Sequence, residues 1–116
     1  YIPHQTVYGD PEGDLLVVGW GGTRGHLQNA VDKMRAEGKK VSLCHFNYIN
    51  PLPANTEEVL RGYKRVIVAE LNTGMFADYL QAKFPGLRIE RINKIQGQPF
   101  LVSEIVNGVT KIMEDK

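Results

Sequence analysis

Short apolar runs and helical patterns alternate along the chain, and this alternation predicts βα units built around a mostly parallel sheet. Residues 14–20 form the first predicted strand, in which the unbroken apolar run is Leu15, Leu16, Val17 and Val18. Such a run is typical of a strand that helices cover on both faces. We therefore expect this strand to lie in the centre of the sheet.

Three further strands are predicted at residues 41–48, 65–71 and 87–93. The segment Asn50-Pro51-Leu52-Pro53 ends the strand at residues 41–48, because proline cannot donate to a strand ladder and disfavours a helix before it. Residues 87–93 alternate apolar and charged side chains, as a half-exposed edge strand does.

Helices are predicted between and after these strands. The first ends at Gly38. Asn55 is predicted to cap the second, with Glu58 completing an approximate capping box, and Asn72 or Thr73 to cap the third, which ends at residues 85–86. Ser103 is predicted to cap the fourth. Their apolar faces carry Leu27, Ala30, Val31 and Met34 in the first, Phe76, Tyr79, Leu80 and Phe84 in the third, and Ile105, Val106, Val109, Ile112 and Met113 in the fourth.

The 116 residues fit one compact domain, which we expect at residues 14–116. Residues 1–13 are interpreted as a linker or an edge-strand lead-in, in which residues 5–8 could add an antiparallel strand. The chain opens on Tyr1 and a stretch rich in proline and glycine, which we interpret as the trimmed edge of a longer polypeptide.

Charge and cysteine content exclude several classes of function. Fourteen Lys and Arg against 13 Asp and Glu leave a net charge of +1, which argues against a nucleic-acid or membrane partner. The single cysteine, Cys44, can form no internal disulfide and cannot bind an iron–sulfur cluster through four thiolates. No apolar run approaches the ~20 residues that span a bilayer. We therefore expect a cytoplasmic protein.

A glycine-rich turn at residues 19–25 joins the first strand to the first helix, where backbone amides can bind an anion. A dinucleotide-binding fingerprint would need a third glycine where Arg24 stands, and a Walker loop would need Gly-Lys-Ser/Thr. We favour a simple tight turn over a site at Gly21, Gly22, Thr23 and Arg24 that binds an anion or coenzyme A.

Other residues with reactive side chains give weak signals. His4, His26 and His45 lack the spacing of a metal motif, and His26 is expected to face solvent. Cys44 and His45 are neighbours on a strand and should point to opposite faces, so we predict no catalytic residue and no metal site.

Glu70 ends a predicted strand and is followed by Asn72, so both are candidates for a ligand or subunit contact at the functional edge of the sheet. Equally, Glu70 could satisfy the amides of the neighbouring turn while Asn72 caps the helix. Phe100, in a loop with glycine and proline, could anchor a subunit contact or fold back onto the core.

Several ordered motifs carry a family resemblance. They are residues 9–21, Asn50-Pro51-Leu52-Pro53, Glu70-Leu71-Asn72 with Gly74, and Lys94 with Gly97, Pro99 and Phe100. Together they resemble the α subunits of 2-oxoacid:ferredoxin oxidoreductases, especially the 2-oxoglutarate type. Met75 departs from the family, which commonly has glutamine there.

The resemblance implies the fold of a transketolase C-terminal domain: a three-layer α/β/α sandwich with a mostly parallel five-stranded sheet and one antiparallel edge strand. It places residues 14–20 between the strands at 41–48 and 65–71. A crevice is then expected between the turns at residues 21–24 and 70–74.

The resemblance also implies an activity for the complete enzyme, which converts a 2-oxoacid, coenzyme A and oxidised ferredoxin into acyl-CoA, carbon dioxide and reduced ferredoxin. Thiamine diphosphate, magnesium and iron–sulfur clusters are implied in that complex, with none bound by this domain alone. The implied partners are the rest of the α subunit, a β subunit that carries thiamine and iron–sulfur clusters, and ferredoxin. Which 2-oxoacid is used stays open.

Three alternatives remain. The last domain of transketolases and of the β subunits of pyruvate dehydrogenase has the same architecture. A shared fold does not identify a reaction. A stand-alone module that binds a nucleotide or another anion at the glycine-rich turn is a second reading. An independent hydrolase has little support, because no nucleophile and base are paired in the sequence.

Overall fold

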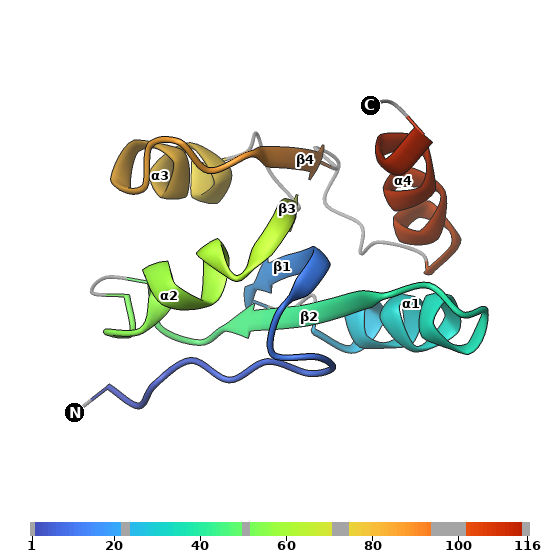
Figure 1. Cartoon of the computed structure of the whole chain (residues 1–116), viewed down its shortest axis with the longest axis horizontal. Helices are drawn as coiled ribbons and strands as arrows, with labels where there is room; N and C mark the ends of the chain where they lie inside the picture. The colour runs from blue at the N-terminus through green and yellow to red at the C-terminus, as the bar shows by residue number, and fades with distance from the viewer. Residues whose placement is uncertain (1, 22–23, 50–51, 71–74, 94–101, 115–116) are drawn as a thin grey trace.

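A computed structural model describes residues 2–21, 24–49, 52–70, 75–93 and 102–114 of the chain (Figure 1). Strands and helices alternate throughout this part, as the hydrophobic pattern predicts. In chain order they are β1 (Gly13–Trp20), α1 (Arg24–Ala36), β2 (Val41–Phe46), α2 (Thr56–Arg61), β3 (Tyr63–Glu70), α3 (Met75–Lys83), β4 (Ile89–Asn93) and α4 (Val102–Glu114).

The four strands form one parallel sheet in the order β2-β1-β3-β4. Val17 of β1 lies opposite Leu43 of β2 on one side and Ile67 of β3 on the other. The central place of β1 and its two neighbours are therefore confirmed. Because the strands are parallel, their carboxyl ends meet at one edge.

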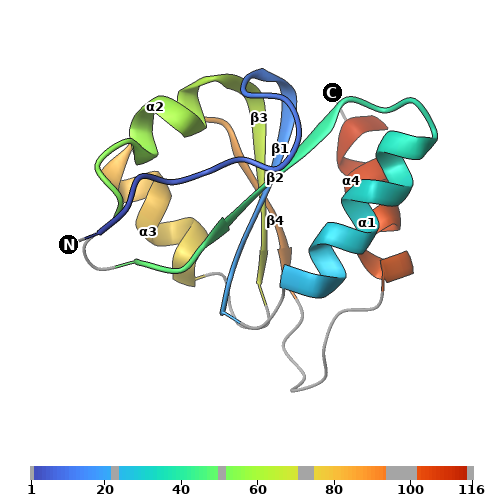
Figure 2. The ribbon, with the colours of Figure 1, turned by 90° about the horizontal axis from the view of Figure 1, so that it is seen from below.

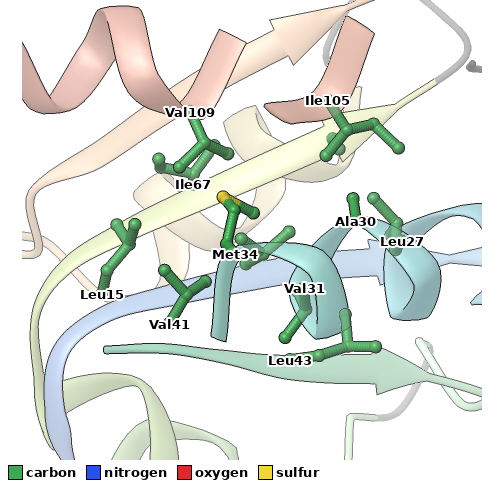
Figure 3. Packing of buried hydrophobic residues seen from close by; sticks show 12 residues of the cluster. Leu15, Leu27, Ala30, Val31, Met34, Val41, Leu43, Ile67, Ile105 and Val109 are labelled. Carbon is green, nitrogen blue, oxygen red and sulfur yellow. The ribbon is translucent and has the colours of Figure 1, made fainter. Parts of the chain in front are cut away.

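Helices cover both faces of the sheet, which gives three layers. Figure 2 shows α1 and α4 on one side and α2 and α3 on the other. Val17 and Met34 belong to the core beneath α1 and α4. The side chains of this core fill the space between the two helices and the sheet (Figure 3). Val18 and Leu80 belong to the opposite core. The α/β class and the layered architecture are confirmed.

The lead-in differs from the expected fifth strand. Tyr8 pairs antiparallel with Leu43 of β2 through two backbone hydrogen bonds of 2.8 and 2.9 Å. This pairing is an isolated bridge, because the amide of Gln5 donates to the side chain of Asn55 at 2.7 Å and not to β2. In the ranges that the structure describes, the sheet has four strands, and the lead-in lies beside its β2 edge.

Two predicted helix caps differ from the structure. Asn55 stands at the N-cap position of α2, as predicted, but makes no side-chain capping bond, because its side-chain amide binds the backbone of Gln5 through both its oxygen and its nitrogen. Ser103 lies inside the first turn of α4, which begins at Val102. The predicted caps Asn72 and Thr73 lie outside the described residues, as does the predicted anchor Phe100.

Element boundaries shift by a few residues. β2 ends at Phe46, two residues before the predicted end, and β3 begins at Tyr63, two residues before the predicted start. The apolar stripe of α1 is as expected, since Leu27, Ala30, Val31 and Met34 are all buried.

Candidate functional site at the carboxyl edge of the sheet

The turn after β1 begins with a backbone conformation that suits glycine. Gly21 has a φ of 70°, in the left-handed region that other residues rarely adopt. α1 then begins at Arg24, whose side chain is exposed. Gly22 and Thr23, the other two residues of the predicted anion site, lie outside the described residues. The backbone geometry at Gly21 thus explains the glycine at that one position.

Glu70 ends β3 with a carboxylate that is almost completely buried, at 1% exposure. Its Oε1 accepts hydrogen bonds from the amide of Phe76 at 2.8 Å and from the indole nitrogen of Trp20 at 3.2 Å. Its Oε2 accepts one from the amide of Ala77 at 2.9 Å. Of the two roles weighed for Glu70, the structure shows the satisfaction of neighbouring amides, here those of the first turn of α3.

An aromatic group surrounds this carboxylate on the α3 side of the sheet. Phe76 lies 5.9 Å from Trp20, 5.4 Å from Phe46 and 6.5 Å from Tyr79, measured between ring centroids. Trp20, Phe76 and Tyr79 line a hollow of about 290 Å³ together with Ile49 and Met75, and Met75 is 67% exposed. We call these five residues the apolar hollow.

His45 of β2 binds the turn after β1. Its Nε2 lies 2.9 Å from the carbonyl oxygen of Gly21, and because that oxygen can only accept, Nε2 must carry the hydrogen. Nδ1 is buried without a hydrogen-bond partner, and Asn47 lies near the ring without completing a bond to it. Burial lowers the pKa of His45, and the positive charge of Arg24 lowers it further. The ring is therefore a neutral tautomer that fixes the turn.

A second hollow, of about 210 Å³, lies between the lead-in, the end of β2 and the start of α1. We call it the polar hollow. The polar side chains that matter in its lining are His4, Gln5, Arg24, His45, Asn47 and Tyr48. Arg24 therefore faces the β2 side of the carboxyl edge. The crevice expected between residues 21–24 and 70–74 involves residues outside the described ranges and stays a prediction.

Cys44 and the remaining histidines lie apart from one another. Cys44 is buried in the core beneath α2 and α3, whereas the neighbouring His45 bonds to Gly21, so the two do not form a catalytic pair. Burial raises the pKa of the Cys44 thiol to about 12. His4 is exposed, and His26, expected to face solvent, is half-buried in α1.

The described residues show neither a metal-binding group nor a membrane-spanning helix. No group of three His, Cys, Asp or Glu side chains is placed to hold a metal ion there. Among the helices of that same part of the chain, none has the length and apolar character needed to span a membrane.

Comparison with known families decides the identity of this fold. Residues 13–105 match the family model for the pyruvate:ferredoxin oxidoreductase core domain II. The chain belongs to this family. The match takes in all of β1 to β4 and the start of α4, so the four-stranded sheet and its helices are the architecture of core domain II.

Relatives of this core domain II carry related names. The chain is 42% identical over 98 residues to the 2-oxoglutarate oxidoreductase subunit KorA of Mycobacterium tuberculosis, which covers 83% of the chain and 15% of the relative. The 2-oxoglutarate:ferredoxin oxidoreductase of Magnetococcus marinus, solved with 2-oxoglutarate, coenzyme A and succinyl-CoA, matches with a TM-score of 0.86 and 28% identity over 96% of this chain and 20% of that one. The resemblance drawn from the sequence motifs is confirmed.

A split-gene transketolase shares the fold, with a TM-score of 0.74 over 96% of this chain and 41% of that one. Its identity of 16% shows the architecture alone and favours the transketolase alternative only weakly. The chain covers 15% of the length of the Mycobacterium tuberculosis relative and 20% of the Magnetococcus marinus chain. Core domain II is thus a small part of those proteins.

Sequence reasoning missed three features of this edge: the bond from Trp20 to Glu70, the bond from His45 to Gly21, and the polar hollow beside the lead-in. A glutamate that ends a buried strand shortly before an apolar helix was a usable signal for the first. The bond from His45 joins residues 24 positions apart, and the polar hollow is lined by separate segments of the chain, so no local pattern announces either.

Proposed function

We propose that this chain is core domain II in the α subunit of a 2-oxoacid:ferredoxin oxidoreductase. The complete enzyme converts a 2-oxoacid, coenzyme A and oxidised ferredoxin into acyl-CoA, carbon dioxide and reduced ferredoxin. The relative at 42% identity supports 2-oxoglutarate as the substrate. Residues 14–116 form a single domain of that subunit, and a lone, buried free cysteine fits a reducing cytoplasm.

The domain acts as a rigid scaffold, and one observation carries this proposal: the reactive side chains at the carboxyl edge already hold the fold. Glu70 binds the first turn of α3, and His45 binds the turn after β1. Cys44 is buried with a pKa of about 12 and is not a thiolate nucleophile at neutral pH. Glu70, His45 and Cys44 are therefore committed to the fold and do not form a nucleophile–base pair with one another.

The cofactors of the complete enzyme do not fit this domain. An iron–sulfur cluster needs several thiolates, and the chain has one cysteine, which is buried in the core. Thiamine diphosphate needs a metal ion held by oxygen ligands, and no acidic cluster for it exists in the part that the structure describes. Thiamine diphosphate, magnesium and the iron–sulfur clusters belong to other domains and to the β subunit. Ferredoxin interacts with those parts of the complex and not with this domain.

The apolar hollow is the surface on which this domain packs against another domain of the same α subunit. Trp20, Phe76 and Tyr79 leave a cavity whose rim carries the exposed Met75. Exposed apolar surface of this kind marks contact sites. The occupant comes from the same subunit because the relative at 42% identity is several times longer than the stretch that this chain covers.

The activity is tested on the assembled enzyme that carries this domain. Reduction of ferredoxin should require both 2-oxoglutarate and coenzyme A and should yield succinyl-CoA, and pyruvate should be a poorer substrate. Absence of turnover with every 2-oxoacid would contradict the enzyme assignment. Preference for pyruvate would contradict the substrate alone.

The packing role is tested by the substitution Met75→Asp in the same subunit. Aspartate is favourable at the first position of a helix, so the domain should stay folded. A charge at the rim of the apolar hollow should reduce the yield of assembled enzyme on size exclusion by roughly tenfold, as expected for an unpaired charge buried at an interface. The control is Asn107→Asp, which adds the same charge on the exposed side of α4. Equal assembly of the two variants would exclude this surface as the contact.

A further inference from the structure

The polar hollow has a clear place in the fold. It lies at the outer side of the carboxyl edge, where the lead-in passes beside β2 and α1 begins. The lead-in is held there by Tyr8, which pairs with Leu43, and by Gln5, whose side chain donates to the carbonyl of His45 at 2.7 Å. The hollow is therefore walled by fixed backbone on the lead-in side.

The polar hollow is electropositive. Arg24 lines it, and no ion pair joins Arg24 to a carboxylate among the described residues. No acidic residue lines the hollow, and the first turn of α1 carries none. The partial positive charge at the start of the 13-residue α1 adds to that of Arg24.

Hydrogen-bond donors also point to a ligand. The hydroxyl of Tyr8 donates to Asp32, and the side-chain amide of Gln5 donates to backbone carbonyls. Asn47 and Tyr48 line the same hollow with exposed side chains, and Asn47 lies near the ring of His45. An arginine and two neutral donors from separate elements suit a compact anion with several acceptor oxygens.

We propose that the polar hollow binds a phosphate group of a small molecule, with Arg24 as its anchor and Asn47 and Tyr48 as further donors. A phosphate carries more charge than a carboxylate and offers acceptors in three directions, which matches donors on α1 and on the segment after β2. The site depends on the geometry of this chain and holds whether or not the proposed reaction is correct. It differs from the site expected in the glycine-rich turn, because the lead-in and the end of β2 supply most of its walls.

The fixed ring of His45 supplies a second test. Its Nδ1 is buried without a partner next to Arg24, and the other titratable groups lining the hollow are His4, Tyr8 and Tyr48. An anion that neutralises Arg24 removes the repulsion that this arginine exerts on a protonated ring. Phosphate binding should therefore raise the pKa of His45, whereas an anion bound elsewhere on the chain should leave it unchanged.

The experiment is a titration of the 116-residue chain with pyrophosphate at constant ionic strength, followed by two-dimensional amide NMR. Amides of residues 4–8, 24–28 and 45–48 should shift together and saturate. Arg24→Gln should weaken binding by about tenfold or more, the loss expected for a charged hydrogen-bond partner. The control Arg61→Gln removes the same charge from the exposed end of α2 and should change the affinity less than twofold.

Three results would overturn the proposal: shifts that do not saturate, equal weakening in Arg24→Gln and Arg61→Gln, or a pKa of His45 that does not respond to pyrophosphate. Acetate serves as the carboxylate comparison, and tighter binding of acetate than of pyrophosphate would also count against a phosphate site. Every readout is made without substrate or ferredoxin. A failure of the phosphate-site proposal can therefore be distinguished from a failure of the proposed enzyme activity.

Discussion

Glu70 places a carboxylate where β1, β3 and α3 meet. It accepts three hydrogen bonds while only 1% exposed, and two of them come from the first turn of a helix, whose dipole favours a negative charge. A buried carboxylate is tolerated when its acceptors are satisfied in this way. Glu70 thus joins two strand ends to the helix that begins between them.

Replacement of Glu70 by glutamine should destabilise the chain. Glutamine keeps one acceptor oxygen but directs an NH₂ donor at a backbone amide, which leaves a buried donor unsatisfied. We expect a loss of about 2–4 kcal/mol in the free energy of unfolding, measured by urea denaturation followed by circular dichroism. The exposed Glu58→Gln provides the matched control and should change the stability by less than about 0.5 kcal/mol. Equal stabilities of the two variants would show that Glu70 does not hold α3.

His45 should make the stability depend on pH. Burial lowers its pKa in the folded chain below the value of about 6.5 expected when unfolded, so the unfolded chain binds the proton first as the pH falls. The stabilisation is therefore complete above pH 6.5 and is lost as the pH drops through the folded pKa. NMR titration should give a pKa below 6.5, and His45→Gln should flatten the dependence of stability on pH between 7 and 5. A pKa above 6.5 would contradict this assignment.

The candidate residues show what sequence can and cannot decide at this scale. Both roles of Glu70 could be named from its position at the end of a buried strand, but the choice needed the positions of the Phe76 and Ala77 amides. The opposite orientations of Cys44 and His45 followed from strand geometry alone. The half-buried state of His26 did not, because the position of a residue near a helix start does not say how much neighbouring chain covers it.

Among the elements, the lead-in depends on a residue that lies far from it in the sequence. Asn55 binds the amide of Gln5 at 2.7 Å and its carbonyl at 3.0 Å, as a neighbouring strand would. Asp10 adds a second attachment, since its amide donates to the hydroxyl of Ser42 at 2.9 Å and its carbonyl accepts from Tyr63. The lead-in is thus fixed to the sheet edge near both ends.

The substitution Asn55→Ala should release the first part of the lead-in. Loss of two partly buried hydrogen bonds should lower the stability by about 1–2 kcal/mol. Hydrogen exchange should accelerate at the amides of Gln5 and Tyr8 more than at those of α2. Faster exchange confined to α2 would instead restore Asn55 to the capping role that the sequence suggested.

Elements with local signals were predicted well, and those with distant partners were not. The stripe of α1 repeats every three to four residues, so its buried face could be read directly. The bond between Asn55 and the lead-in could not be predicted in this way, because Gln5 lies 50 positions away and competes with the helix for the same side chain. Pairing of the lead-in likewise depends on the edge that β2 leaves open.

For the molecule as a whole, two cores pack on opposite faces of a sheet whose inner strands are buried on both sides. Cys44 lies within one of these cores, on β2 and beneath α2 and α3. Access to its thiol requires the strand to separate from those helices. The single cysteine should therefore report opening of the entire fold.

Alkylation of Cys44 by iodoacetamide at pH 8 should be negligible in the native chain, because burial both blocks the thiol and raises its pKa to about 12. Labelling should appear with increasing urea at the same midpoint as the loss of helical circular dichroism. Rapid labelling without urea, or at a much lower urea concentration than the dichroic change, would mean that the sheet opens locally at β2.

The global topology came from two kinds of information. The alternation of strands and helices predicted a layered parallel sheet, because a parallel connection needs a crossover helix. The order β2-β1-β3 was supplied by the family resemblance, since hydrophobicity alone places β1 centrally but does not choose its neighbours. Within the described residues, the lead-in adds a bridge where an edge strand was expected, because the side chain of Asn55 binds the backbone of Gln5.

Trp20 gives this domain an intrinsic optical probe. It is the single tryptophan of the chain, its indole donates to the buried carboxylate of Glu70, and its ring lines the apolar hollow. Docking of a neighbouring domain would exclude water from one side of the indole while its other contacts stay in place. Assembly can then be followed as a blue shift of fluorescence emission, without an attached dye.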